Sequence, residues 1–195
     1  MKKLIVFFLL IYTSYSVYSQ DDAPEGLFIG SKAPDFKAND QRGNEIHLKD
    51  LLKKGPVVLV FYRGYWCPFC NRELSRFQDS IGLILDKGAT VVAVTPEMPE
   101  NIAKTVEKTK AEFSILHDED LKIMKAYDVD FVVPENTVNR YRTADIDLTK
   151  INGKSGAVLP VPGVFIIDKE QTITYRFFDP DYKKRPSVKE IVAAL

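Results

Sequence analysis

Residues 56–70 read PVVLVFYRGYWCPFC and join two different structural signals. The first part, residues 56–62, is a continuous apolar run rich in β-branched side chains, which predicts a strand buried on both faces of a sheet. The second part contains Cys67 and Cys70 and leads into apolar residues that recur at helical spacing. We therefore predict a central strand that passes through a short loop into a long helix over residues 67–86.

Strand and helix signals alternate along the rest of the chain, which indicates an α/β fold with a central mixed sheet flanked by helices. Residues 128–155 mix Pro, Arg, Asp and Asn without a clear period, and we predict an insertion there with one short helix. The other expected elements are an N-terminal β-hairpin (34–38 with 45–48), helical turns over 48–54, strands 89–95 and 111–116, helices 99–109 and 121–127, a hairpin (164–167 with 173–178) and a last helix over 188–195 capped by Ser187.

The first residues have the pattern of a secretory signal peptide. Two lysines precede a short apolar run over residues 4–12, and small residues follow up to Ser19. The run is shorter than the roughly 20 residues of a membrane-spanning helix, which disfavours the alternative of an uncleaved anchor. We expect cleavage near Ser19, a loose segment over 20–27, one domain over 28–195, no stable membrane insertion, and export to a periplasm or the cell exterior.

Charge and cysteine content narrow the function classes. The chain has 27 basic and 27 acidic residues that are interspersed along it, so nothing indicates nucleic-acid binding. It has only two cysteines, whereas a small secreted protein stabilised by disulfides would have more, at wider spacing. A bridge between Cys67 and Cys70 closes a very short loop and stabilises little by the chain-entropy argument. The pair is therefore a candidate redox site.

The position of the cysteines supports the same chemistry. Cys67 falls at the predicted helix start, where free N–H groups and the helix dipole favour a thiolate, and we expect it near solvent. The i, i+3 spacing brings the sulfur of Cys70 within bonding reach, and Pro68 suits the first turn of a helix. Alternatives are a passive disulfide, two inert buried thiols, or a zinc site in which His47 and His117 would have to converge. We expect no metal and no cofactor.

Two family resemblances bear on the fold. Residues 66–70 resemble the Trp-Cys-x-x-Cys site of thioredoxins. The wider frame resembles the AhpC/TSA group of peroxiredoxins, and more closely the peroxiredoxin-like proteins of bacteria, from about residue 28 to residue 195. The segments that carry this resemblance are 29–36, 60–62, 164–168, the insertion 128–155, the run 159–162 and the tail 179–182. The resemblance implies a thioredoxin-like fold.

The site also departs from the peroxiredoxin pattern, which is Pro-x-x-x-Thr-x-x-Cys. Arg63 stands in place of the Pro and Cys67 in place of the Thr, so only Cys70 matches, at the peroxidatic position. The arginine that peroxiredoxins bring from a later strand falls at or near Pro162. Arg63 is a candidate to supply this positive charge, and the alternative is a solvated loop residue.

The thioredoxin resemblance suggests further supporting residues. Pro162, just before a predicted strand, matches the cis-proline that thioredoxins place against the cysteine pair. A cis bond there would leave the backbone of Val161 free to pair with an extended substrate. Trp66 and Tyr65 are either substrate-facing aromatics or a cover for the core, and we favour the first role for Trp66.

Two enzymatic mechanisms remain open at this point. In the first, Cys67 attacks a protein disulfide and Cys70 resolves the mixed disulfide. In the second, Cys70 attacks a hydroperoxide and becomes a sulfenic acid, and Cys67 condenses with it. Either mechanism requires an external, thioredoxin-like dithiol as electron donor. A third hypothesis is a non-enzymatic binding domain with a vestigial cysteine pair and the insertion as its interaction surface.

Overall fold

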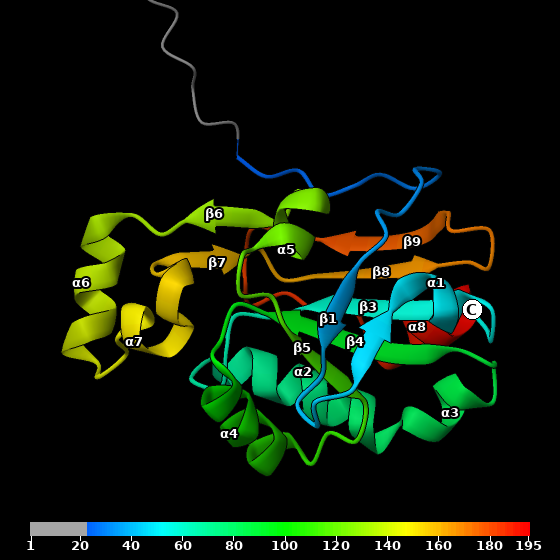
Figure 1. Ribbon diagram of the computed structural model, residues 1–195, viewed down its shortest axis with the longest axis horizontal. Coiled ribbons are helices and arrows are strands. Elements are labelled where there is room, and N and C mark those ends of the chain that lie inside the picture. Colours follow the sequence, from blue (N-terminus) through cyan, green and yellow to red (C-terminus); the bar gives the residue numbers. More distant parts are fainter. Residues whose placement is uncertain (1–22) are drawn as a thin grey trace, which may run out of the picture.

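The strand predicted from residues 56–62 lies at the centre of a five-stranded mixed sheet in the computed structural model, which describes residues 23–195 (Figure 1). On one side of the central strand, two successive strands run parallel to it. On the other side, the next strand pairs antiparallel with the central strand, and the edge strand pairs antiparallel with that one. The predicted mixed α/β architecture is therefore confirmed. The strands, in sheet order, are β5 (Ser114–His117), β4 (Thr90–Thr95), β3 (Val57–Phe61), β8 (Gly163–Ile167) and β9 (Ile173–Phe178).

Both faces of the sheet are covered, which is why β3 is apolar at every position. Successive side chains of a strand point to opposite faces. Leu59 and Phe61 thus join one buried cluster, and Val58 and Val60 join another. The first cluster is covered by the hairpin β1 (Lys37–Asn39) and β2 (Glu45–His47) with α1 (Leu48–Leu52) and α5 (Lys122–Ala126); the second by α2 (Pro68–Asp79), α3 (Ile81–Leu85), α4 (Pro99–Thr109) and α8 (Val188–Ala194).

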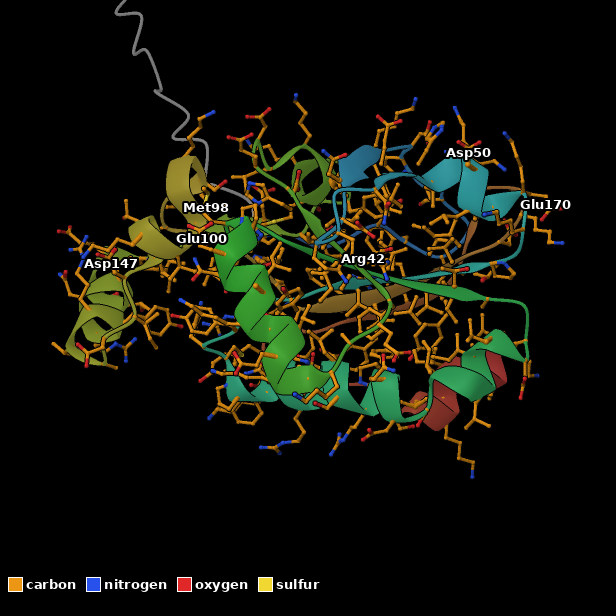
Figure 2. The ribbon with its side chains drawn as sticks, turned by 60° about the horizontal axis from the view of Figure 1, so that its bottom comes forward. Arg42, Asp50, Met98, Glu100, Asp147 and Glu170 are labelled. Atoms are coloured by element: carbon orange, nitrogen blue, oxygen red, sulfur yellow. The ribbon has the colours of Figure 1, made fainter. Side chains whose placement is uncertain are left out.

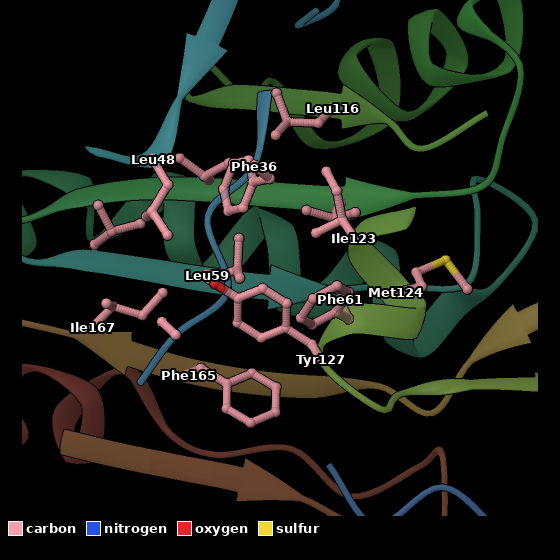
Figure 3. Packing of buried hydrophobic residues seen from close by; sticks show 14 of the residues in the cluster. Phe36, Leu48, Leu59, Phe61, Leu116, Ile123, Met124, Tyr127, Phe165 and Ile167 are labelled. Atoms are coloured by element: carbon pink, nitrogen blue, oxygen red, sulfur yellow. The ribbon is translucent and has the colours of Figure 1, made fainter. Parts of the chain in front are cut away.

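Aromatic rings fill the first cluster. Figure 3 shows the rings of Tyr127, Phe61 and Phe165 next to one another, and the centroids of Phe61 and Phe165 lie 5.4 and 5.8 Å from that of Tyr127. Its hydroxyl donates a hydrogen bond to the backbone carbonyl of Pro34, at 2.9 Å. This contact satisfies the polar end of a buried tyrosine and ties the N-terminal segment to the sheet.

The long helix predicted over residues 67–86 is wrong in one respect, because it is broken. The break lies at Ser80, whose backbone (φ −113°, ψ 14°) leaves the helical region between α2 and α3. Asp79, Ser80 and Gly82 all have low helix propensity, and their concentration within four positions accounts for the interruption. The predicted helix end at residue 86 agrees to within one residue, because α3 ends at Leu85, and Gly88 follows with a positive φ of 72°.

The insertion over residues 128–155 contains more structure than the predicted short helix. It holds a strand, β6 (Asp130–Val132), two helices, α6 (Glu135–Thr143) and α7 (Leu148–Asn152), and a short 3-10 turn over Gly153–Ser155. Strand β6 pairs antiparallel with β7 (Val158–Pro160) outside the main sheet. Helix α6 escaped detection because it buries only Val138 and therefore lacks an apolar stripe.

Hydrogen bonds attach the insertion to the rest of the chain beside the start of α4. The backbone N–H of Met98 and the side-chain amide of Asn101 both donate to the carbonyl of Ile151, at 2.9 and 3.0 Å. Figure 2 shows Met98 and Glu100 at this end of α4, next to the helices of the insertion. The insertion is therefore held at the same end of the sheet as the start of α4.

Most of the remaining elements match the predictions. Helix α4 has the predicted bounds, and Ser187 caps α8 with a capping box that includes Glu190. The predicted signal peptide lies outside the described residues. Within residues 23–195, no helix is long and apolar enough to cross a membrane.

Candidate active site

The two cysteines lie together where β3 leads into α2. Cys67 is the N-cap residue of α2 and Pro68 begins the helix, so that Cys70 sits one turn further along. The Cys70 thiol donates a hydrogen bond to the sulfur of Cys67, with 2.8 Å between the two Sγ atoms. Both thiols are free, and their separation is close enough for a disulfide to form with little movement.

The pKa of the Cys67 thiol is lowered to about 6. The largest cause is the hydrogen bond from the Cys70 thiol, and the backbone N–H of Cys70 adds to it, whereas burial opposes the shift. Arg63 and Arg185 contribute positive charge. The pKa of Cys67 is thus lowered, as predicted from its place at the helix start. The main contribution, however, comes from Cys70, which the first turn of the helix brings close to Cys67.

The pKa of the Cys70 thiol moves in the opposite direction, well above its ordinary value. Burial is the largest cause, and the neighbouring Cys67 adds to it. One turn of helix therefore holds one thiol that ionises readily and one that keeps its proton.

The expectation that Cys67 lies near solvent is wrong, since only 1% of its surface is exposed. Cys67 belongs to the same buried cluster as Cys70 and Leu74, and the rings of Trp66 and Phe69 pack against that cluster. An aromatic cover thus restricts which molecules reach the sulfur.

A buried arginine from the C-terminal tail lies beside Cys70. Arg185 Nη2 is 3.4 Å from Cys70 Sγ, and Arg185 Nε donates to Glu73 Oε2 at 2.6 Å. Glu73 lies one turn after Cys70 on α2, and its carboxylate is almost fully buried. Burial raises the pKa of Glu73 to about 8, although the charge of Arg185 opposes the shift.

Arg63 is the centre of an aromatic cage rather than a solvated loop residue. It is 3% exposed, and its guanidinium carbon lies 4.8, 5.7 and 4.3 Å from the ring centroids of Trp66, Tyr141 and Tyr182. Its Nη2 also donates to the Tyr141 hydroxyl. Cation–π contacts of this kind partly replace the water that a buried cation loses. The loop, the insertion and the tail each supply one ring.

A second buried acid, Glu97, fixes the loop before Cys67. Its Oε1 accepts the backbone N–H of Tyr65 at 2.8 Å, and its Oε2 accepts the hydroxyls of Tyr62 and Thr105, each at 3.3 Å. Gly64 has a φ of 147° and no room for a side chain, because a Cβ would lie 2.6 Å from Glu97 Oε1. Burial raises the pKa of Glu97 to about 7 in spite of these hydrogen bonds.

This raised pKa predicts a pH-dependent stability. A carboxyl that titrates near 4.5 in the unfolded chain and near 7 in the fold contributes stability below pH 4.5, which is lost as the pH rises through 7. Between pH 4 and pH 8, the free energy of unfolding of Glu97→Gln should fall by about 2–3 kcal/mol less than that of the wild-type protein. The reason is that glutamine keeps an acceptor oxygen but does not ionise. Urea unfolding at pH values from 4 to 8 measures this difference.

The matched control is Glu100→Gln, an exposed residue in the first turn of α4, three positions after Glu97, which should leave the pH profile unchanged (Figure 2). Identical pH profiles for Glu97→Gln and the wild-type protein would show that Glu97 does not titrate in this range.

Tyr65 and Trp66 diverge from each other. The Tyr65 ring lies between two lysines of α4, with Lys104 Nζ and Lys108 Nζ at 4.7 and 4.9 Å from its centroid. The Trp66 ring faces the insertion, 5.1 Å from the ring of Tyr141. Only Trp66 therefore joins the cage around Arg63.

The predicted cis bond before Pro162 is wrong, because residues 23–195 contain no cis peptide bond. The backbone N–H of Val161 is also not free, since it donates to the carbonyl of Val129 at 2.7 Å. The pairing of β6 with β7 continues through this contact and keeps the chain extended as it enters β8. Both residues nevertheless line the cavity that contains Arg63.

Three charged residues at the site were missed from the sequence. Glu73 falls among the polar residues of the predicted helix, and its spacing of three from Cys70 is the one signal that the sequence offers for it. Glu97 and Arg185 gave no signal at all, because only tertiary packing brings them to the cysteines. His47 and His117, the histidines of the zinc alternative, do not join them: His47 pairs with Asp35 and Asp50, and His117 ends β5.

Known proteins share this frame. A model of the AhpC/TSA family matches residues 29–176. Thiol-disulfide oxidoreductase ResA of Geobacillus thermodenitrificans is 31% identical over 131 residues, covering 66% of this chain and 74% of ResA. A putative peroxiredoxin bcp of Helicobacter pylori is 37% identical over 103 residues, covering 53% of this chain and 67% of the relative. The crystal structure of peroxidoxin BcpB from Mycobacterium tuberculosis matches in fold, with a TM-score of 0.66 at 20% identity, over 85% of this chain and 94% of that one.

Proposed function

Because the chain belongs to the AhpC/TSA family and is an oxidoreductase that acts through cysteines, we propose that it reduces disulfides with Cys67 as the attacking thiolate and Cys70 as the resolving thiol. The observation that carries this proposal is the split between the two thiols. Cys67 has a pKa of about 6, whereas the pKa of Cys70 is raised well above its ordinary value. At neutral pH most of Cys67 is therefore thiolate, which is the nucleophilic form.

The reaction then takes two exchanges. The Cys67 thiolate attacks one sulfur of the substrate disulfide, the S–S bond breaks, and the first thiolate leaves and takes a proton from water. Cys70 next attacks the sulfur of Cys67, and the second departing thiolate takes the proton that Cys70 gives up. The substrate gains two electrons and the cysteine pair becomes a disulfide. An external, thioredoxin-like dithiol returns the pair to its reduced state.

One prediction concerns the origin of the low pKa of Cys67. The hydrogen bond from Cys70 is its largest cause, so Cys70→Ala should raise the pKa of Cys67 towards the value of about 8.5 for a free cysteine. Cys70→Ser keeps a donor at the same position and should retain most of the shift. Thiolate absorbance in the ultraviolet across a pH titration measures both variants. Equal pKa values in Cys70→Ala and the wild-type protein would contradict the proposed origin.

Peroxide reduction is the second candidate function, and the position of Arg185 favours it. A guanidinium 3.4 Å from the sulfur of Cys70 stabilises a thiolate there, at the residue that matches the peroxidatic position. The buried site also admits a molecule as small as hydrogen peroxide more readily than a folded protein. In this mechanism Cys70 becomes the sulfenic acid and Cys67 resolves it.

Single-cysteine variants separate the two functions. Under the disulfide reductase proposal, the intact protein reduces insulin disulfides rapidly, and hydrogen peroxide oxidises it slowly. Rapid formation of a sulfenic acid in Cys67→Ser that is absent in Cys70→Ser would overturn this proposal in favour of the peroxidase. The sulfenic acid is trapped with a dimedone reagent and located by mass spectrometry.

We also propose that the protein is exported. The support is the signal-like pattern that ends near Ser19, with residues 28–195 as the redox domain. N-terminal sequencing of the protein recovered from its native compartment tests this proposal, and an intact Met1 would contradict it.

A further inference from the structure

A cavity of about 920 Å³ opens between the insertion, the tail and the loop before Cys67. This volume lies within the usual range for small-molecule sites. Its walls are mainly apolar and rich in proline, and one of them carries Arg63 of the aromatic cage. Most of the apolar walls come from residues 131–134 of the insertion and residues 160–162 after it, and Pro180 of the tail and Ala23 and Pro24 of the N-terminal segment complete them.

Arg63 is poorly satisfied for a buried cation. Its Nη2 donates to Tyr141, but its buried Nε has no hydrogen-bond partner among residues 23–195. In the described part of the chain, Arg42 and Arg185 each form an ion pair with a carboxylate, whereas Arg63 forms none. A buried charge without a paired anion is costly, so this arrangement points to an anionic group that is supplied from outside.

The charges around the cavity favour an anion. Arg140 of α6 is exposed and also lines it, whereas the acid on its described walls is Asp130. Lys125 partly offsets the charge of Asp130, which is itself half-buried.

We infer that this cavity binds the substrate and selects disulfides that carry a carboxylate on an apolar stem, with Arg63 and Arg140 as its anion-binding residues. This inference rests on the proposed disulfide reductase function and names its substrate class. Arg63 lies close enough to Cys67 to lower the pKa of that thiol. Neither cysteine is itself on the described walls of the cavity, so a carboxylate held at Arg63 places the attached disulfide beside the aromatic cover of Cys67.

Binding is tested first, without chemistry. Suberate has the chain length of 3,3′-dithiodipropionate but contains no sulfur, and 1,8-octanediol and 1,8-diaminooctane are its neutral and cationic counterparts. Trp66 is the single tryptophan of the chain, so its emission reports directly on the cage. We expect suberate to give a saturable change in Trp66 emission. The wild-type protein should bind the diol and the diamine at least about tenfold more weakly than suberate, and Arg140→Gln should bind suberate at least about tenfold more weakly than the wild-type protein does.

Arg140→Gln alters an exposed side chain and leaves Cys67 untouched, so it tests the site even if Arg63→Gln fails to fold. Arg142→Gln is the matched control, since Arg142 is exposed on the same helix and its side chain donates only to Asn139 among the hydrogen-bond partners described. Equal binding of suberate and the diol, no binding of any probe, or equal binding by Arg140→Gln and Arg142→Gln would overturn the inference.

Exchange rates then separate this inference from the function on which it rests. The protein is reacted with 3,3′-dithiodipropionate, bis(2-hydroxyethyl) disulfide and cystamine, and the ratio of wild-type to Arg140→Gln rates is taken for each, which cancels the differing leaving groups. We expect a ratio of about ten for the anion and near one for the neutral disulfide. Suberate binding with no exchange would reject the disulfide reductase alone, whereas exchange with equal ratios would reject the anion site alone.

Discussion

Cys67→Ser is expected to abolish disulfide reduction, with a fall in rate of about 1,000-fold or more. Serine retains the volume and the position at the start of α2, but a hydroxyl does not ionise near neutral pH. The variant therefore loses the nucleophile while the fold remains. The measurement is the rate of insulin reduction at pH 7 with dithiothreitol as electron donor, corrected for the reaction of dithiothreitol alone.

Cys70→Ser is the matched variant, and it should fail at a different step. Its Cys67 thiolate still attacks, so the expected product is a stable mixed disulfide between Cys67 and the substrate, visible by mass spectrometry. The opposite pattern, with turnover lost and the mixed disulfide trapped at Cys70 in Cys67→Ser, would reverse the two roles.

Arg185→Ala is expected to destabilise the fold by about 3–5 kcal/mol above pH 9, because it leaves the buried carboxylate of Glu73 without its partner. The raised pKa of Glu73, about 8 in the intact protein, determines how this loss varies with pH. Without the arginine the pKa rises further, and below it the carboxyl is neutral. The destabilisation should therefore be smaller at pH 6 than above pH 9, as measured by urea unfolding.

Two further variants test the cause. Lys184→Ala removes an exposed ion pair with Asp179 on the same segment and should change stability by no more than about 1 kcal/mol. The double variant Glu73→Leu with Arg185→Met replaces the buried pair by apolar groups and should recover most of the stability. A double variant as unstable as Arg185→Ala would show that the arginine acts through packing rather than through Glu73.

The central sheet could be predicted because its signals are local. The apolar β-branched runs that form β3 and β8 are buried on both faces, and no other element of comparable length fits them. The break at Ser80 was missed because apolar periodicity continues on both sides of it. The insertion was underestimated because α6 and α7 pack on a small cluster of their own, built around Val138, Leu148 and Leu159.

The cysteine pair was predictable for the same reason, since an i, i+3 spacing at a helix start already places two sulfurs together. Its electrostatic surroundings were not. Arg63 is adjacent in sequence, but its burial depends on Tyr141 and Tyr182, which come from the insertion and the tail. Glu97 and Arg185 reach the site only after the chain has crossed the sheet, and no sequence pattern encodes such contacts.

The tail contact also has a consequence for biosynthesis. Arg185 lies 115 positions beyond Cys70, so a ribosome releases the cysteines long before it releases their guanidinium partner. Strand β8, the antiparallel neighbour of β3, likewise emerges after them. The nascent polypeptide thus carries Cys70 without its guanidinium neighbour for most of its elongation, and the buried surroundings of the pair are completed only at the final stage of its production.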